Sequence, residues 1–145
     1  MPVLRPKAEI AACFVHYSGS WLVRPMDGTQ RWDIPLTRVE GDCSNPAQAI
    51  RKMTKNLLGR EILVSQFWDV GTYPNARGET CAVHFVEAHH DDVRAAEHDG
   101  FQWLQTDEIE LVAHRWFLPA LREARRLIAM RDLEAQAMQD ATDAA

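Results

Sequence analysis

The sequence lacks the features that membrane, secreted and zinc-stabilised proteins require. No apolar run approaches the roughly 18 residues that a membrane-spanning helix needs, and the segment MPVLRPKAEI has no apolar signal-peptide core. The cysteines, Cys13, Cys43 and Cys81, are far apart and form no CxxC pair. This spacing argues against a structural zinc site and favours reduced thiols. We therefore expect a cytoplasmic protein without a membrane segment.

An excess of basic residues is also absent. The 145 residues include 16 Lys and Arg against 21 Asp and Glu, which gives a net charge of −5. This balance argues against non-specific binding to nucleic acids or to membrane surfaces. The composition, 46% hydrophobic and 26% charged, is ordinary for a globular domain. The length favours one domain, which we place at residues 1–138, with a frayed tail at 139–145.

The first half of the chain predicts three strands and a helix. Two strands, within residues 8–17 and 21–24, flank the turn Ser18-Gly19-Ser20 and form a hairpin. A third strand at 31–34 is stopped by Pro35.

The mid-chain helix has signals at both ends and along one face. Ser44 or Asn45 can cap its start, ahead of Pro46 in the first turn. Gly59 stands where a C-cap is expected. Between these ends an apolar face recurs at helical spacing, at Ile50, Met53 and Leu57.

The second half predicts strands at residues 61–70, 80–88 and 101–104, with loops between them at 73–78 and 89–100. A short helix capped by Thr106 follows and ends at Leu111, and a last helix runs over residues 119–138. Elements in this order predict an α/β fold, in which a mixed sheet is flanked by the mid-chain helix and a long C-terminal helix.

The mid-chain region carries a known family pattern, G-x5-E-x7-R-E-U-x-E-E-x-G-U, in which U is aliphatic and which a tryptophan and a proline precede. Here RWDIP supplies Trp32 and Pro35, VEGD corresponds to the approach to the helix, and NPAQAIRKM corresponds to its start, with Arg51 at the family's arginine. This region resembles the Nudix hydrolase family.

A second motif, EHDGFQWL at residues 97–104, lies late in the chain. It resembles the E-H-x-x-[FY]-x-W-L segment of Nudix subgroups that include dinucleoside polyphosphate hydrolases and a pterin triphosphate pyrophosphohydrolase. Together the motifs extend the resemblance over residues 8–135. They imply a Nudix-like α/β/α sandwich.

The chain departs from the pattern at the family's catalytic positions. Its three helix glutamates fall on Lys52, Lys55 and Asn56, and the upstream glutamate falls on Cys43, next to Asp42. The resemblance implies that these glutamates hold Mg²⁺ or Mn²⁺ against a diphosphate, because hard divalent ions need oxygen ligands. Lysine offers no acceptor and repels a cation. Metal-dependent hydrolysis by the usual arrangement is therefore not expected.

The leading hypothesis is a protein that binds a nucleotide or another diphosphate-containing ligand, with weak or absent hydrolase activity. Lys52 and Lys55, with Arg51 and Arg24 nearby, would hold the anionic ligand in place of the metal, since an ammonium binds phosphate as a point charge. The alternative interpretation is a solvated basic helix face, with Arg51 bonding loop carbonyls near the helix start.

Two other functions stay open. One is an active hydrolase of a nucleoside diphosphate linked to another moiety. It would use Glu40, Asp42 and Glu97 as ligands of Mg²⁺ or Mn²⁺, with Asp42 and Glu97 also in catalytic roles. Each carboxylate also has a plain interpretation as a loop or surface residue. The other is an interaction module that keeps the fold, for instance as a homodimer, and binds no nucleotide.

Histidines and aromatic residues carry weaker signals. The run His89-His90-Asp91-Asp92 is rich in metal-ligand types, but adjacent residues of an extended segment point to opposite faces, so we expect a solvated loop. His84 is expected to be a hydrogen-bonded core residue, and His16 shows no partner by spacing. Most aromatic residues are expected in the core. Candidates for stacking on a base are Phe67, Trp68 and Tyr73.

Overall fold

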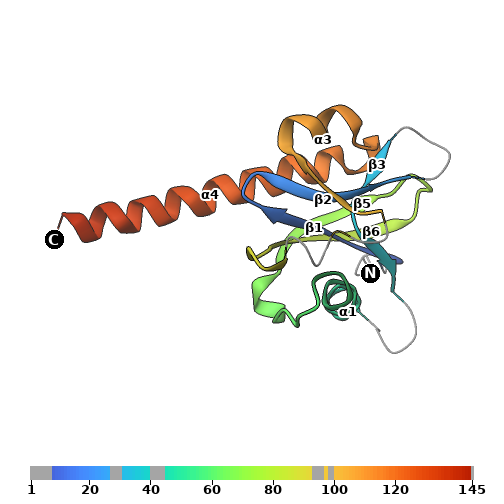
Figure 1. Cartoon of the computed structure of the whole chain (residues 1–145), viewed down its shortest axis with the longest axis horizontal. Coiled ribbons are helices and arrows are strands. Elements are labelled where there is room, and N and C mark those ends of the chain that lie inside the picture. Colours follow the sequence, from blue (N-terminus) through green and yellow to red (C-terminus); the bar gives the residue numbers. More distant parts are fainter. Residues whose placement is uncertain (1–7, 27–30, 40–44, 93–96, 98–99, 145) are drawn as a thin grey trace, which may run out of the picture.

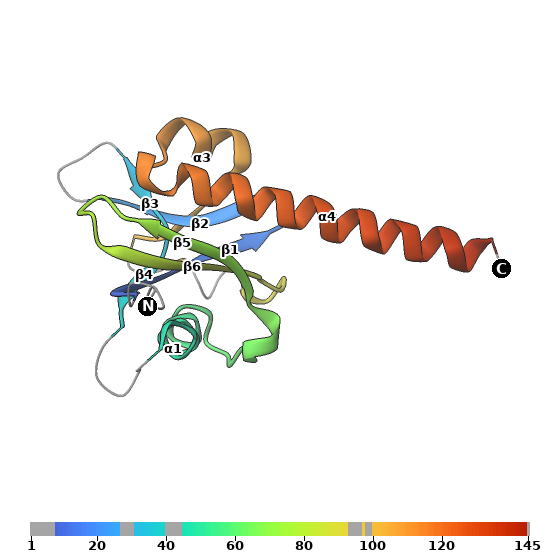
Figure 2. The same cartoon turned by 180° about the vertical axis from the view of Figure 1, so that it is seen from behind.

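A computed structural model describes residues 8–26, 31–39, 45–92, 97 and 100–144. A mixed sheet runs through the middle of the molecule. Helix α1 (Pro46–Leu58) covers one face, and α3 (Thr106–Val112) and α4 (Leu118–Asp143) lie on the other (Figure 1, Figure 2). The arrangement confirms the predicted α/β/α sandwich, with α1 alone on its face among the described helices.

The sheet follows the order β3-β2-β1-β6-β5, with β4 paired to β1 and β7 paired to β2. The pair β1–β6 is parallel, and the other pairs are antiparallel. This mixture confirms the predicted mixed sheet. The strands are β1 (Ile10–Tyr17), β2 (Ser20–Pro25), β3 (Trp32–Asp33), β4 (Leu36–Arg38), β5 (Trp68–Pro74), β6 (Thr80–Glu87) and β7 (Gln102–Gln105).

Two hydrophobic clusters occupy the two faces of the sheet. Successive side chains of β1 alternate between them, since neighbouring residues of a strand point to opposite faces. Phe14 packs with Ile109 and Phe117 on the side of α3 and α4, whereas Val15 packs with Ile50 on the side of α1. Because β1 is covered on both faces, its sequence is a continuous apolar run without polar alternation.

The segment after α1 differs from the sequence-based prediction of a strand over 61–70. A 3₁₀ turn, η1 (Val64–Gln66), occupies part of that range, and Leu63 and Val64 are exposed. Strand β5 begins only at Trp68 and continues through Pro74, which the sequence places in a loop. Proline is tolerated there because β5 lies at the edge of the sheet and pairs only with β6. The short strand β4 is not predicted from the sequence.

The helices on the second face also differ from the prediction in detail. The N-cap of α3 is Gln105 and not Thr106. The Thr106 hydroxyl instead accepts a hydrogen bond from Trp21 Nε1 at 3.0 Å and donates to the Gly19 carbonyl at 3.2 Å. A 3₁₀ turn, η2 (Arg115–Phe117), leads into α4, which continues to Asp143, past the predicted end at Met138. Among the described residues, no helix is long and apolar enough to cross a membrane.

Candidate functional site

Helix α1 is the element that carries the predicted site, and local interactions fix both of its ends. The Asn45 side chain accepts a hydrogen bond from the Gln48 backbone N–H at 2.9 Å, as predicted for an N-cap. Gly59 ends the helix with a φ of 73°, a left-handed conformation that glycine adopts without strain. Ile50 and Leu57 are buried against the sheet. The opposite face of the helix therefore points outward.

That outward face carries Lys52, Lys55 and Asn56, all of them exposed. The two lysines are three residues apart, so they lie on one side of the helix with about 5–6 Å between their Cβ atoms. Neither forms an ion pair or a hydrogen bond with any described residue. The helix itself contains no Asp or Glu. The structure thus brings together the two lysines that the sequence singles out and leaves both side chains accessible.

Arg51 lies at the side of this face and has a partner that sequence reasoning missed. Its guanidinium donates to the Glu61 carboxylate, which follows the end of the helix. Glu61 is ten residues away in sequence, so helical spacing gives no signal for the pair. This contact partly neutralises Arg51, and Lys52 and Lys55 remain as the exposed, unpaired cations of α1.

Arg24 lies on the same side of the sheet as α1. It is two residues after Leu22 on β2, and Leu22 packs in the cluster that α1 covers. The Arg24 guanidinium carbon sits 5.1 Å from the centre of the Phe101 ring, a cation–π contact. Phe101 is in that same cluster. Among the four predicted ligand-binding residues, Arg24 thus contacts an aromatic ring, and its cross-strand partner Asp33 adds an electrostatic interaction.

The predicted carboxylates are only partly placed by the structure. Glu97 is exposed, and Glu40, Asp42 and the neighbouring Cys43 lie outside the described residues. Within the described part of the chain, no group of three His, Cys, Asp or Glu side chains is arranged to hold a metal ion. Ammonium and amide groups on the outward face of α1 do not supply the carboxylate ligands that Mg²⁺ prefers. The described residues therefore do not fit the metal site that the family pattern implies.

In the run His89-His90-Asp91-Asp92, the first three residues are exposed, as expected for a solvated loop, and only Asp92 departs from that expectation. Asp92 is 2% exposed. It accepts two hydrogen bonds of 2.8 Å from Arg60 and one of 2.7 Å from the His89 backbone N–H. These contacts use both carboxylate oxygens, so Asp92 anchors the chain after β6 to the end of α1 and is not available as a metal ligand.

His16 and His84 also differ from their predictions. His16 Nδ1 bonds the Glu87 carboxylate at 2.9 Å, and the two residues are direct partners in the parallel pairing of β1 with β6. That long-range pairing is the signal that spacing along the chain could not supply. His84 Nδ1 is buried without a hydrogen-bond partner among the described residues. Its burial lowers the pKa of the imidazole, because the charged form loses its hydration.

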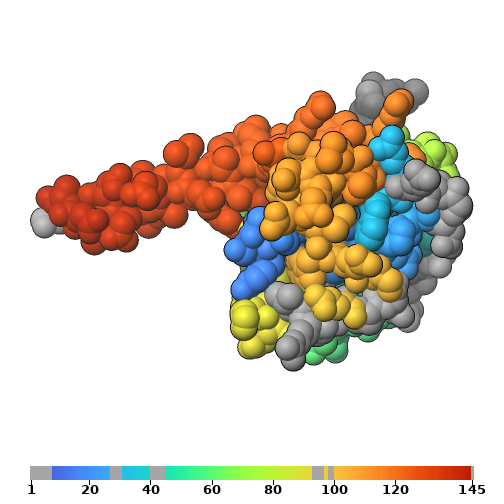
Figure 3. All heavy atoms as spheres, turned by 45° about the horizontal axis from the view of Figure 1, so that its top comes forward, coloured from blue at the N-terminus to red at the C-terminus, as the bar shows by residue number. Residues whose placement is uncertain are grey.

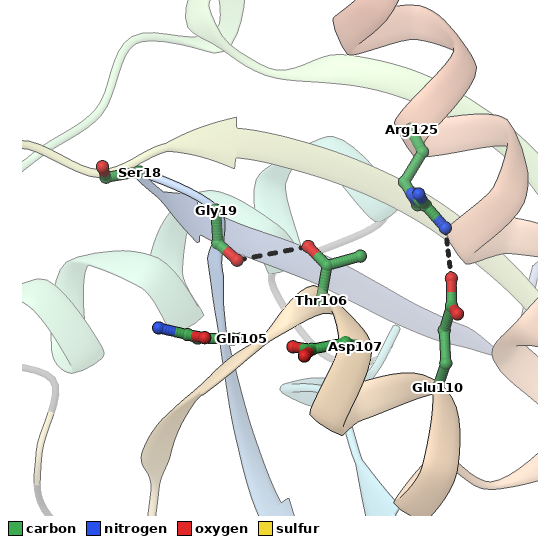
Figure 4. Close-up of a pocket in the computed structure, with 7 residues that line it drawn as sticks. All are labelled: Ser18, Gly19, Gln105, Thr106, Asp107, Glu110 and Arg125. Carbon is green, nitrogen blue, oxygen red and sulfur yellow. Dashed lines mark hydrogen bonds and ion pairs between the residues drawn. The ribbon is translucent and has the colours of Figure 1, made fainter.

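A pocket of about 440 Å³ lies on the opposite side of the sheet from α1 (Figure 4). Its charged groups are two carboxylates and one guanidinium, and the guanidinium of Arg125 is paired with Glu110. An excess of carboxylates repels a phosphate, so the face of α1 is the better candidate for an anionic ligand. The pocket is lined by Ser18, Gly19, Gln105, Thr106, Asp107, Glu110 and Arg125.

Comparison with known proteins identifies the fold. No family model matches the sequence, and no curated protein matches it. Solved structures do match. A mutT/nudix family protein from Listeria innocua superimposes with a TM-score of 0.71 at 14% identity, over 90% of this chain and 99% of that one. This chain has the Nudix fold.

Two further comparisons with solved structures are informative. The NUDIX domain of Shewanella oneidensis NrtR, solved in complex with ADP ribose, matches with a TM-score of 0.63 at 9% identity, over 86% of this chain and 90% of that one. The C-terminal domain of mouse MUTYH, solved in complex with human PCNA, matches with a TM-score of 0.60 at 18% identity, over 85% of this chain and 88% of that one. Likeness at these identities extends to the fold and not to an activity or a ligand.

Proposed function

We propose that this protein binds a nucleotide or another diphosphate-containing ligand on the outward face of α1, and hydrolyses it weakly or not at all. One observation carries the proposal. Lys52 and Lys55 occupy positions at which the Nudix pattern has glutamates, and both are exposed and unpaired among the described residues.

The charges on this face favour a phosphate over a metal ion. Two ammonium groups on one side of a helix attract a diphosphate directly, and each can donate a charge-assisted hydrogen bond to it. Arg24 adds a third positive charge on the same side of the sheet, where Phe101 holds it in place. The ADP-ribose complex of the NrtR domain shows that the same fold accepts such a ligand in another protein.

Weak or absent hydrolysis follows from the same residues. Cleavage of a diphosphate by metal catalysis needs carboxylates that hold the ion and activate a water molecule. On α1 none of those positions carries a carboxylate, because Lys52 and Lys55 can only donate hydrogen bonds and Asn56 offers only a neutral amide oxygen. The ligand would therefore be held without an attacking nucleophile beside it.

Calorimetry tests the binding. The full chain is titrated with ADP-ribose in the presence of EDTA, together with a double variant, Lys52→Glu and Lys55→Glu. We expect binding by the wild type and a loss of roughly tenfold or more in the variant, since one charged hydrogen bond contributes about 1.5–3 kcal/mol.

The matched control changes the net charge by the same amount outside α1. Arg77→Glu with Arg115→Glu replaces two exposed cations that form no ion pair with a described residue, and its affinity should equal that of the wild type. If the lysine variant retains wild-type affinity, the proposed site is wrong. Equal weakening by both double variants would mean that only the net charge matters.

A metal titration separates this proposal from an active hydrolase. Mg²⁺ or Mn²⁺ is added to the protein with a panel of nucleoside diphosphate derivatives, and product release is followed by chromatography. We expect that the wild type shows no more metal-dependent turnover than a Glu97→Gln variant measured under the same conditions. Turnover that depends on the metal and disappears with Glu97→Gln would instead establish the hydrolase, with Glu97 in the role that the second motif implies.

A further inference from the structure

Helix α4 extends well past the body of the molecule (Figure 1, Figure 3). Its first turns are docked, with Ala120, Leu121 and Ala124 buried. Further along, Arg131 Nη1 donates to Glu87 Oε1 at 2.9 Å. From Asp132 to Ala144 every residue is exposed. Twelve residues of helix span about 18 Å, so the C-terminal half of α4 projects as an uncovered rod.

An apolar stripe runs onto the projecting half, and no other element of the described structure covers it, although Arg126 of the same helix contacts the Met130 sulfur. Met130 is 44% exposed and Leu133 is 70% exposed. Ala137 continues the same line, at spacings of three and four residues. Since most of the stability of a helix comes from packing an amphipathic face, an uncovered stripe on a projecting helix marks a surface for a partner.

The same line stays open along the docked half of the helix. Going back from Met130 by turns of about four residues, it passes through Arg126 and Arg122, and both are exposed. Ala120 and Ala124 face the sheet on the other side of the helix. A second helix can therefore lie along the full length of α4 without displacing the body.

Charge is divided between the two halves of α4. Residues 118–130 carry three arginines and one glutamate, which is a net charge of +2. Residues 131–143 carry one arginine and four carboxylates, which is a net charge of −3. A helix charged in this way is complementary to a second copy of itself that runs in the opposite direction. A parallel pair would place the two acidic halves side by side, which is unfavourable.

We propose that two copies of this chain associate through α4, as an antiparallel helix pair. With the two-fold axis between Met130 and Leu133, Met130 of each copy packs on Leu133 of the other. Arg126 then lies against the other copy's Ala137, within one turn of its Asp140. The contact covers the exposed stripe and sets each basic half against an acidic half, and antiparallel alignment also favours the two helix dipoles.

Light scattering after size exclusion tests the assembly on the full chain. The wild type should elute with about twice the chain mass of 16.5 kDa, and Leu133→Glu should reduce it to the mass of one chain. Met138→Glu is the matched control. Met138 is 73% exposed but lies three turns after Leu127, away from the stripe, so this variant should remain a dimer. Circular dichroism establishes that the variants are folded.

Disulfide trapping tests the direction of the pair. Mixed and oxidised Arg126→Cys and Ala137→Cys chains should form a cross-link between the two variants, whereas Ala137→Cys alone should form little more cross-linked product than wild type. Efficient cross-linking of Ala137→Cys to itself would overturn the antiparallel arrangement. A wild type that is monomeric would overturn the proposed interface, and so would a dimer that persists in Leu133→Glu. The apolar stripe would then have to bind a different protein.

Discussion

Asp92 shows how single residues hold this fold together at a distance. Burial on its own raises the pKa of its carboxyl, but the hydrogen bonds from Arg60 and from the His89 backbone, together with the Arg60 charge, outweigh it and lower the pKa. Because Arg60 follows α1 and Asp92 follows β6, the pair fastens the one helix described on that face to the end of a central strand.

Asp92→Asn should therefore destabilise the protein. It leaves Arg60 with a weaker acceptor, and we expect the free energy of unfolding at pH 7 to fall by about 1–3 kcal/mol. The contribution of a carboxyl with a lowered pKa is present above its unfolded pKa of about 3.9 and is lost as the pH falls through the folded value. The deficit should accordingly shrink below about pH 3.9.

Urea unfolding at several pH values measures this effect. Asp91→Asn removes a carboxylate from the exposed neighbouring position and should change stability by less than about 0.5 kcal/mol. Equal effects of the two substitutions would show that the Arg60 contact contributes nothing of its own.

The partners of the individual residues were the hardest part to predict. Asp92 and Arg60 are 32 residues apart, and His16 and Glu87 are 71 apart. The register of β1 with β6 brings His16 to Glu87, and the packing of α1 on the sheet brings Arg60 to Asp92. Neither effect can be read from spacing along the chain. What the sequence does show at this scale is residue type. The residue types of Lys52 and Lys55 are enough to make them unsuitable as metal ligands, because an ammonium group has no acceptor.

Among the elements, those with local signals are the ones predicted correctly. Helix α1 has its N-cap, its apolar face and its left-handed glycine within one short segment, and each acts through the helix itself. The segment around β5 has no such signals. Leu63 and Val64 have the side chains of a strand, yet they are exposed in a turn. The start of β5 is decided by its pairing with β6, which is a tertiary effect.

Gly59→Ala tests the end of α1. Gly59 has a φ of +73°, and a Cβ added there would meet nothing within 4 Å. The cost therefore comes from the backbone alone, and we expect a loss of roughly 1 kcal/mol in the free energy of unfolding. Gly59→Asn should cost less, because asparagine tolerates the left-handed region better. A loss with alanine no larger than with asparagine would mean that α1 ends in some other conformation in solution.

At the scale of the whole molecule, the two proposed surfaces lie on opposite faces of the sheet. Helix α1, whose outward side carries Lys52 and Lys55, covers one face of the sheet. Helix α4 crosses the other face (Figure 2). The ligand-binding proposal and the dimer proposal therefore rest on different residues, and either one can fail alone. A dimer through α4 would also leave α1 of both copies accessible, because the stripe on α4 points away from the sheet.

Removal of residues 132–145 tests the role of the projecting helix in the whole molecule. In the described structure no buried side chain comes from beyond Arg131. We expect the truncated chain to keep its own stability within about 0.5 kcal/mol, measured by denaturation at low protein concentration.

The full chain should differ from the truncated chain in how its melting temperature depends on protein concentration. Its melting temperature should rise with protein concentration, because association stabilises the folded state by mass action, and the truncated chain should show no such rise. A truncated chain that loses several kcal/mol even when dilute would mean that the projecting helix stabilises its own body and not a second copy.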